Sequence, residues 1–230
     1  MSTQLITEVA DPRDQKRYYF HATPLRRVMT PTLRAVFWFF SSLQVNGVEN
    51  LPPEGPVVLA ANHMTNFDVF PMQFVLSRPI FFIGKEELFR NPILDWLLRQ
   101  LGGFPVYRSS HDQWAIKHAQ EVLQHGQVLG IFPEGKRNKG TGLRPAKTGA
   151  ARLALAVDCP IVPMSIHGSQ YLFHHFPRRT RIKMFVGKPI FPRPGETQLA
   201  LTDRLMYTLA GMLPPESRGV YARRPTGFRL

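Results

Sequence analysis

The sequence is poor in cysteine and in acidic residues. Its 230 residues include one cysteine, Cys159, which excludes a disulfide framework and makes a reducing compartment the default. The chain has 16 aspartates and glutamates against 29 lysines and arginines, so its formal net charge is +13. Such a surplus indicates a polyanionic partner, either nucleic acid or an anionic membrane surface, and charge alone also allows a basic protein with neither.

A long apolar run is also missing. The most apolar stretch near the N-terminus, Ala35 to Phe40, is far shorter than the about 20 residues that a membrane-spanning helix needs. Arg26, Arg27 and Arg34 precede it, which suits a helix lying in a membrane interface. An ordinary helix packed on the domain explains the same pattern, and both remain open. The polar N-terminus does not have the order of a signal peptide.

Short apolar runs alternate with helical patterns along the rest of the chain. The sequence predicts strands at 57–60, 80–83, 104–107, 128–132, 161–166 and 182–186, and helices near 32–43, 68–77, 92–101, 111–125, 148–157 and 197–213. This alternation predicts an α/β fold with a central, mostly parallel or mixed sheet flanked by helices. We divide the chain into an N-terminal helical, membrane-interfacial segment, residues 1–46, and a main domain, residues 47–230.

A histidine and an aspartate follow the first of these strands. His63 and Asp68 are separated by five positions, which on a continuous helix places them about 140° apart, on different faces. They can meet only if His63 lies in the loop and Asp68 opens the next helix, where a carboxylate is favoured. Asp68 would then fix the tautomer of His63 and leave its other ring nitrogen free as a base. A histidine beside a helix cap without catalytic function fits the same spacing.

A tight basic turn follows the strand at 128–132. It contains Glu134, Gly135, Lys136 and Arg137, so a carboxylate, a glycine and two cations lie within four residues. Turns of this kind bind phosphate, because backbone N–H groups and cations converge on it. A solvated basic loop is the alternative interpretation.

Four segments together resemble the motifs of the glycerolipid acyltransferase family, whose best-known members acylate lysophosphatidic acid. They occur in the family's order: Asn62-His63 with Asp68, then Gly103 to Arg108, then Phe132 to Arg137, then Ile161 to Met164. The resemblance runs from about residue 47 to 190. Lys136 departs from the family, which usually has Thr there, and Thr65 stands where Ser is frequent.

The resemblance implies an O-acyltransferase that transfers the acyl chain directly, without an acyl-enzyme, and no cofactor motif appears in the sequence. The donor would be acyl-CoA or acyl-carrier protein, and the acceptor a lysophospholipid, first of all 1-acylglycerol-3-phosphate. It further implies that His63 is the general base, oriented by Asp68. The implied substrate-binding residues are Lys85, Arg108, Glu134, Gly135, Lys136 and Arg137. Residues 47–230 would form the acyltransferase domain, working at the cytoplasmic face of a membrane as a peripheral or monotopic protein.

Several rival interpretations follow from the same residues. The acceptor could instead be glycerol 3-phosphate or another lysolipid, or the chain could be a non-catalytic membrane-binding protein of the same fold. A nucleic-acid binder is disfavoured, because the chain has no recognised binding module. Cys159 lacks a basic neighbour to activate it, and His167, His174 and His175 lack the spacing of a metal site.

Overall fold

The structure, a computed structural model, describes residues 11–107, 112–174, 176–228 and 230. The helices are α1 (Pro24–Phe40), α2 (Val69–Val75), α3 (Pro92–Gln100), α4 (Gln113–Gln124), α5 (Gly149–Val157) and α6 (Gln198–Gly211). The strands are β1 (Ser41–Asn46), β2 (Val57–Ala61), β3 (Ile80–Lys85), β4 (Gly103–Val106), β5 (Val128–Ile131), β6 (Ile161–His167) and β7 (Thr180–Val186).

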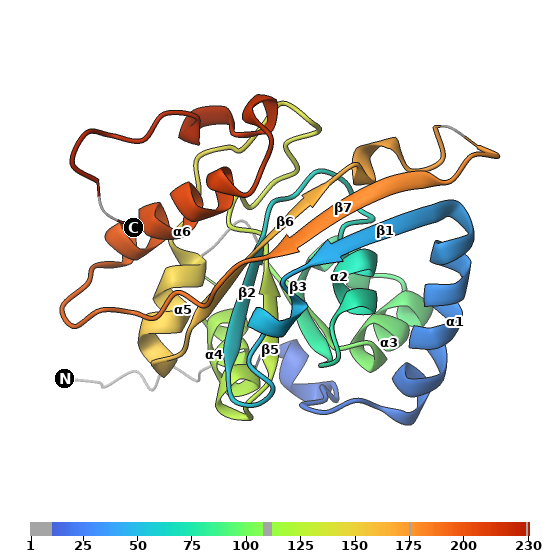
Figure 1. Cartoon of the computed structure of the whole chain (residues 1–230). Helices are drawn as coiled ribbons and strands as arrows, with labels where there is room; N and C mark the ends of the chain where they lie inside the picture. The colour runs from blue at the N-terminus through green and yellow to red at the C-terminus, as the bar shows by residue number, and fades with distance from the viewer. Residues whose placement is uncertain (1–10, 108–111, 175, 229) are drawn as a thin grey trace, which may run out of the picture.

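The seven strands form one mixed sheet in the order β1-β7-β6-β2-β5-β3-β4. The five strands from β6 to β4 are mutually parallel, β7 is antiparallel to β6, and β1 is parallel to β7. This confirms the predicted α/β fold with a mostly parallel or mixed sheet. Because the parallel strands end at the same edge, the loops after β2, β5 and β6 emerge together, along the top of Figure 1.

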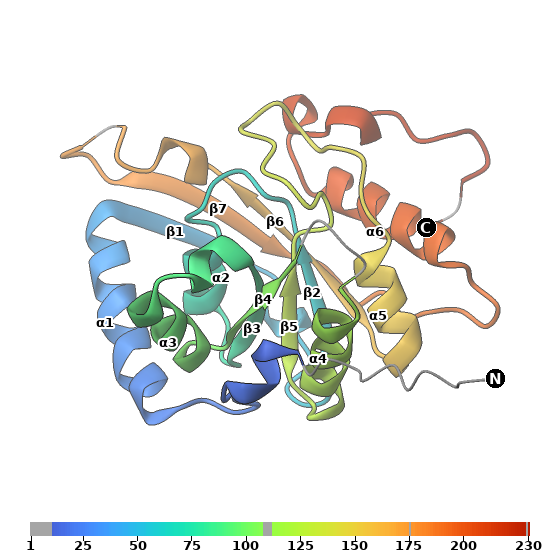
Figure 2. The same cartoon turned by 180° about the vertical axis from the view of Figure 1, so that it is seen from behind.

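Two hydrophobic clusters enclose the sheet. Alternate residues of β2 belong to each: Val58 and Ala60 lie in the cluster with α4, α5 and α6, while Val57 and Leu59 lie in the cluster with α1 and α2. All five residues of β2 are buried, as expected for a central strand covered on both faces. Figures 1 and 2 show α1, α2 and α3 at one side of the molecule and α5 and α6 at the other.

Six of the predicted strands and five of the predicted helices are confirmed within a few residues. The helix expected at 32–43 is wrong at both ends. It starts at Pro24, because the Thr23 side chain accepts a hydrogen bond from the Arg26 N–H and proline suits a first helical position. It ends at Phe40, and β1 follows, paired with β7. The segment of residues 1–46 therefore contributes an edge strand to the sheet.

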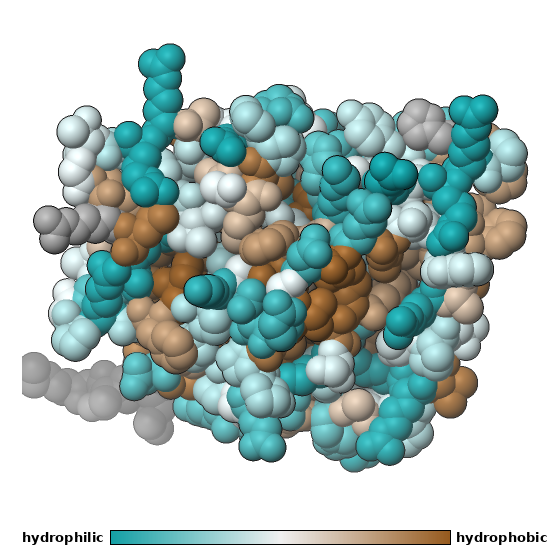
Figure 3. Space-filling model, in the orientation of Figure 1, coloured by the Kyte–Doolittle hydropathy of each residue, from teal (hydrophilic) through white to brown (hydrophobic). Residues whose placement is uncertain are grey.

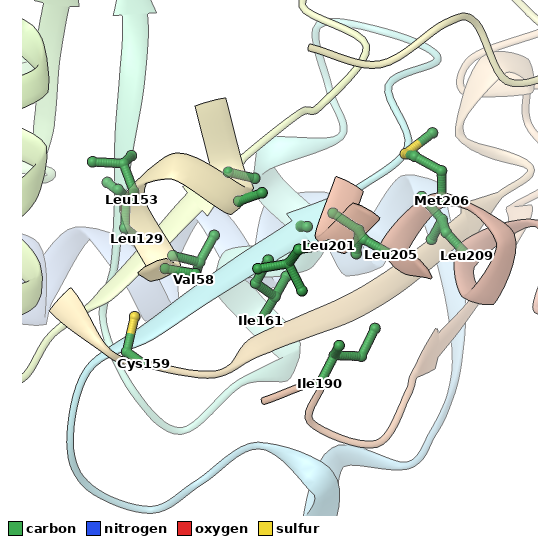
Figure 4. Close-up of a cluster of buried hydrophobic side chains, with 14 of the residues drawn as sticks. Val58, Leu129, Leu153, Cys159, Ile161, Ile190, Leu201, Leu205, Met206 and Leu209 are labelled. Carbon is green, nitrogen blue, oxygen red and sulfur yellow. The ribbon is translucent and has the colours of Figure 1, made fainter. Parts of the chain in front are cut away.

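Cys159 belongs to the first hydrophobic cluster, in the company of Val58 and Ile161 (Figure 4). Its side chain is buried, and burial raises the pKa of the thiol to about 11. A thiol with that pKa carries almost no thiolate at neutral pH, which agrees with the expectation that Cys159 is not a nucleophile.

The face drawn in Figure 3 carries both hydrophilic and apolar residues. On the face drawn in Figure 3, long hydrophilic side chains surround apolar residues that gather near the middle. Within the described part of the chain, no helix combines the length and the apolar character needed to cross a bilayer.

Candidate active site

The candidate site starts where β2 leaves the sheet. The Asn62 side chain accepts a hydrogen bond from the Ile166 N–H, 2.7 Å, and donates one to the Ile166 carbonyl, 2.8 Å. These bonds extend the contact between β2 and β6 by one residue beyond the backbone ladder. They therefore fix the point at which His63 enters the loop at the carboxyl edge of the sheet, where α/β proteins bind ligands.

His63 and Asp68 meet as the spacing predicted. His63 lies in the loop, Asp68 is the residue before α2, and His63 Nδ1 lies 2.9 Å from Asp68 Oδ2. The Asp68 side chain does not cap its own helix; it turns back and accepts hydrogen bonds from the N–H groups of Met64, 2.6 Å, and Thr65, 2.8 Å. One carboxylate thus holds both the loop backbone and the imidazole.

The environment of His63 leaves one ring nitrogen available. An ionised carboxylate can only accept hydrogen bonds, so Nδ1 is the donor in this contact, and in a neutral ring the lone pair then lies on Nε2. No hydrogen bond in the described part of the chain involves Nε2, and the His63 side chain is 18% exposed. The Phe132 ring stacks on the imidazole with centroids 4.0 Å apart and planes 15° apart. The ring is therefore held on one face by Phe132 and at Nδ1 by Asp68.

The Glu134 carboxylate holds the backbone of the same loop by a hydrogen bond. It is 4% exposed and accepts hydrogen bonds from the N–H groups of His63, 2.8 Å, and Arg144, 2.9 Å, and from the Asn138 side-chain amide. Burial raises the pKa of Glu134, and the hydrogen bonds from His63 and Arg144 oppose that rise. The Asn138 N–H also donates to the His63 carbonyl, 2.7 Å. Glu134 therefore ties the basic turn to the histidine loop.

The basic turn presents two cations to solvent. Lys136 and Arg137 are exposed, and neither forms an ion pair with any described residue. Gly135 has φ +65°, a left-handed conformation that strains any other residue, and its N–H closes the turn onto the Phe132 carbonyl. The stem of Lys147 lies beside Gly135, where an added Cβ would be 3.3 Å from Lys147 carbons. Lys147 adds a third cation that the sequence analysis did not assign to the site.

Two further cations were predicted to bind substrate. Lys85 is the last residue of β3 and is exposed, at the same edge of the sheet as the end of β2. Arg108 lies outside the described residues.

No metal centre is formed by the described residues. They contain no group of three histidine, cysteine, aspartate or glutamate side chains placed to hold an ion. His167 has a buried Nδ1 without a hydrogen-bond partner, His174 is exposed in the segment between β6 and β7, and His175 lies outside the described residues.

Comparisons with known proteins agree with this architecture and define its class. The profile of the Acyltransferase family matches residues 42–167, more than half of the chain. The chain belongs to this acyltransferase family. The crystal structure of the 1-acyl-sn-glycerophosphate acyltransferase from Thermotoga maritima has the same fold, with a TM-score of 0.65 over 81% of this chain and 78% of that one, at 24% identity.

Two curated relatives are similar in sequence, and both are named 1-acyl-sn-glycerol-3-phosphate acyltransferase. The protein from Bacillus subtilis is 29% identical over 69% of this chain and 78% of its own length. The protein from Borreliella burgdorferi is 30% identical over 56% of this chain, and the match spans 52% of that protein.

Proposed function

We propose that this protein transfers a fatty acyl chain from acyl-CoA or acyl-carrier protein to the free hydroxyl of 1-acylglycerol-3-phosphate, forming phosphatidic acid. The observation that carries the proposal is the His63–Asp68 pair, with Nδ1 bound at 2.9 Å and Nε2 without a hydrogen bond among the described residues. The names of the two curated relatives support the choice of acceptor.

In the proposed reaction His63 is a general base. Its Nε2 takes the proton of the acceptor hydroxyl as the oxygen attacks the thioester carbonyl. The C–S bond then breaks, and the sulfur of the donor leaves with the proton returned by the imidazolium. Asp68 holds Nδ1 and stabilises the positive ring that forms between these steps. General-base assistance of this kind is worth about 10²–10⁴-fold.

The exposed cations support binding of the acceptor's phosphate. Arg137 and Lys136 follow β5, Lys85 ends β3, and all three are free of carboxylate partners among the described residues. A cation without a counter-ion keeps its full charge for a phosphate, and arginine can bind it through two hydrogen bonds. We include Arg108 on the strength of the family resemblance, with Gly135 giving the turn its shape and Glu134 holding it in place.

We also propose that the enzyme docks peripherally on the cytoplasmic face of an anionic membrane. The supporting feature is an aromatic rim, which we define as Trp38, Phe39, Phe173 and Phe176, with side chains 63%, 62%, 48% and 64% exposed. The Phe40 ring packs edge-on against both Phe39 and Phe173, so the end of α1 and the segment after β6 form one surface. Large exposed aromatic surfaces are unusual on soluble monomers and suit a lipid interface.

Cations accompany the aromatic rim. The Arg179 guanidinium lies 4.3 Å from the centre of the Trp38 ring, and Arg178 next to it is exposed. Phe173 also packs edge-on against Phe67, the residue before Asp68. The rim therefore reaches the histidine loop along the edge of the sheet at the top of Figure 1, where the segment at 214–224 also lies. This arrangement would bring the lipid substrates to His63 from the bilayer.

The reaction can be tested with purified full-length protein and a mixed pool of acceptors. The pool should contain 1-acylglycerol-3-phosphate, glycerol 3-phosphate and other lysolipids, offered with acyl-CoA and then with acyl-carrier protein. Mass spectrometry should find phosphatidic acid as the dominant product. A different dominant product would replace the proposed acceptor, and donor turnover without any acylated product would reject acyl transfer.

Membrane docking can be tested by co-sedimentation with vesicles rich in anionic phospholipid. Binding should weaken as salt rises, since each basic residue near the surface contributes about 1 kcal/mol. Replacing Phe39 and Phe173 together by Ala should weaken binding further. Phe191→Ala is the matched control, because Phe191 is 62% exposed but lies outside the aromatic rim. Equal loss in the control, or release by detergent alone, would contradict this docking surface.

A further inference from the structure

The two oxygens of Asp68 have different partners. Oδ2 accepts from His63 Nδ1 and from the backbone of Met64 and Thr65. Oδ1 accepts from the Ser169 hydroxyl at 2.6 Å and from the Thr65 hydroxyl at 3.2 Å. The shorter of these two bonds comes from a residue 101 positions away, in the segment after β6.

The backbone conformation around Ser169 places its hydroxyl next to Asp68. Gly168 has φ +99°, and a Cβ at this position would lie 2.3 Å from the Arg181 carbonyl oxygen, so the chain can turn here only with glycine. The Gly168 N–H donates to the Gln170 side chain, 3.0 Å, and a short 3-10 helix, η4 (Ser169–Tyr171), begins at once. Ser169 is 1% exposed, and its side chain is therefore enclosed together with Asp68.

Because Asp68 and Ser169 are both buried, loss of the hydrogen bond between them should have a large effect. The Asp68 side chain is 0% exposed, so water cannot replace a lost donor at Oδ1. An O–H group 2.6 Å from a carboxylate oxygen lies in the range of strong, charge-assisted hydrogen bonds. The Thr65 hydroxyl at 3.2 Å is a weaker substitute, and it belongs to the same loop that Asp68 has to position.

We propose that Ser169 is a positioning residue that acts through Asp68 on His63. Its hydroxyl prevents rotation of the carboxylate, so that Oδ2 stays directed at Nδ1 and Nε2 keeps its direction toward the acceptor. The role rests on the proposed function, in which His63 is the base. It connects the chemistry to the segment that carries Phe173 and Phe176, which is otherwise part of the docking surface.

The experiment compares three variants in the acyl-transfer assay. Ser169→Ala should lower kcat by about ten- to hundredfold, the value of a hydrogen bond to a charged group, with KM for both substrates changed less than about threefold. Ser169→Thr, which retains the hydroxyl, should recover most of the activity. Ser41→Ala is the matched control: Ser41 is also fully buried, and its hydroxyl donates to the Phe37 carbonyl. It should lower the melting temperature without lowering kcat.

A double-mutant cycle separates positioning from structural support. In the Asp68→Asn background, Ser169→Ala should reduce kcat by less than about threefold further, because the interaction through which it acts is already lost. Full, independent losses in the cycle would overturn the proposal. So would a kcat loss that Ser169→Thr fails to recover in a protein that melts like the wild type.

A second readout keeps this inference separate from the proposed function. The proton on His63 Nδ1 gives an NMR signal whose position reports the bond to Asp68, whether or not the protein transfers acyl chains. Ser169→Ala should shift this signal and Ser41→Ala should not. Wild-type protein that acylates no acceptor would reject the proposed function, and the NMR comparison would then decide the role of Ser169 alone. An unchanged signal in Ser169→Ala would reject that role.

Discussion

His63 is partly buried and His118 is buried, yet their surroundings suit the two rings to different roles. His63 lies at the carboxyl edge of the sheet, with Nδ1 bound to a buried carboxylate and its side chain 18% exposed. His118 lies in α4, is 7% exposed, and stacks on Trp114 with ring centroids 4.9 Å apart. Further rings pack around it, from Tyr18, Phe20 and Phe104.

The difference teaches that the partner, and not burial alone, determines what a histidine can do. Burial, with Arg13 adding a smaller effect, lowers the pKa of His118 to about 4, so this imidazole is neutral at physiological pH. The Arg13 guanidinium is itself paired with Asp112, 2.6 Å, and Asp11, 2.6 Å, which fixes it in place. His118 is a polar member of the core, whereas Nδ1 of His63 is bound to a carboxylate that orients the ring.

The largest effect is expected from replacing His63. His63→Ala should lower acyl transfer by about two to four orders of magnitude and leave thermal stability nearly unchanged, since a loop residue carries little of the core. His118→Ala should do the reverse, lowering the melting temperature with kcat nearly intact in the folded fraction. Both variants are assayed for phosphatidic acid formation and thermal unfolding. Near-normal transfer by folded His63→Ala would end the proposed mechanism.

The next largest effect is expected from replacing Asp68, and it tests the role of the carboxylate. Asp68→Asn replaces an acceptor by a group that can donate at the same position, so the imidazole loses the partner that fixes its tautomer. Transfer should fall by about a hundredfold or more at every pH tested, because a change of pH does not restore the orientation of the ring. Near-normal formation of phosphatidic acid by a folded Asp68→Asn protein would show that His63 does not need the carboxylate to hold it.

The sequence predicted the parallel strands well because their signals are local. Runs such as Val57 to Ala60 are apolar throughout and bounded by turn residues. The edge strand β1 was missed because Ser41 to Asn46 has only Leu43 and Val45 as apolar residues, and its conformation depends on pairing with β7, far along the chain.

The candidate site was predictable to a similar, local extent. The spacing of His63 and Asp68 gave the loop-and-helix arrangement, since both residues lie in one short segment. The bond from Ser169 and the stacking of Phe132 join segments that are distant in sequence, so no local pattern contains them. A glycine followed by serine just after a buried strand is the one signal that could have suggested Ser169.

A smaller effect is expected from His118, in the pH dependence of the free energy of unfolding. The pKa of His118 falls from 6.5 to about 4 on folding, so its contribution to stability is complete above about pH 6.5 and is lost as the pH falls toward 4. Between pH 7 and pH 5 the loss should be about 1–2 kcal/mol, because the Glu121 carboxylate, 3.6 Å from Nδ1, offsets part of it. His118→Phe should remove this component in urea unfolding. An unchanged pH dependence would mean that His118 is not the group responsible.

The smallest expected effect is that of Arg137→Ala, and Arg13 is the arginine to compare it with. Arg13 is held by two carboxylates, whereas Arg137 is exposed and has no ion-pair partner among the described residues. If Arg137 binds the acceptor's phosphate, Arg137→Ala removes a charge-assisted contact and should lower kcat/KM for the phosphorylated acceptor by about tenfold. Hydrolysis of the thioester in the absence of acceptor should change much less.

If the arginine instead binds phosphates of coenzyme A, the KM for acyl-CoA should rise and hydrolysis should slow equally. Lys139→Ala is the control, since Lys139 is exposed in the same loop but was not assigned to the site. Equal losses in the two reactions would reject the acceptor-phosphate role, because only a contact with the acceptor can affect transfer without affecting hydrolysis.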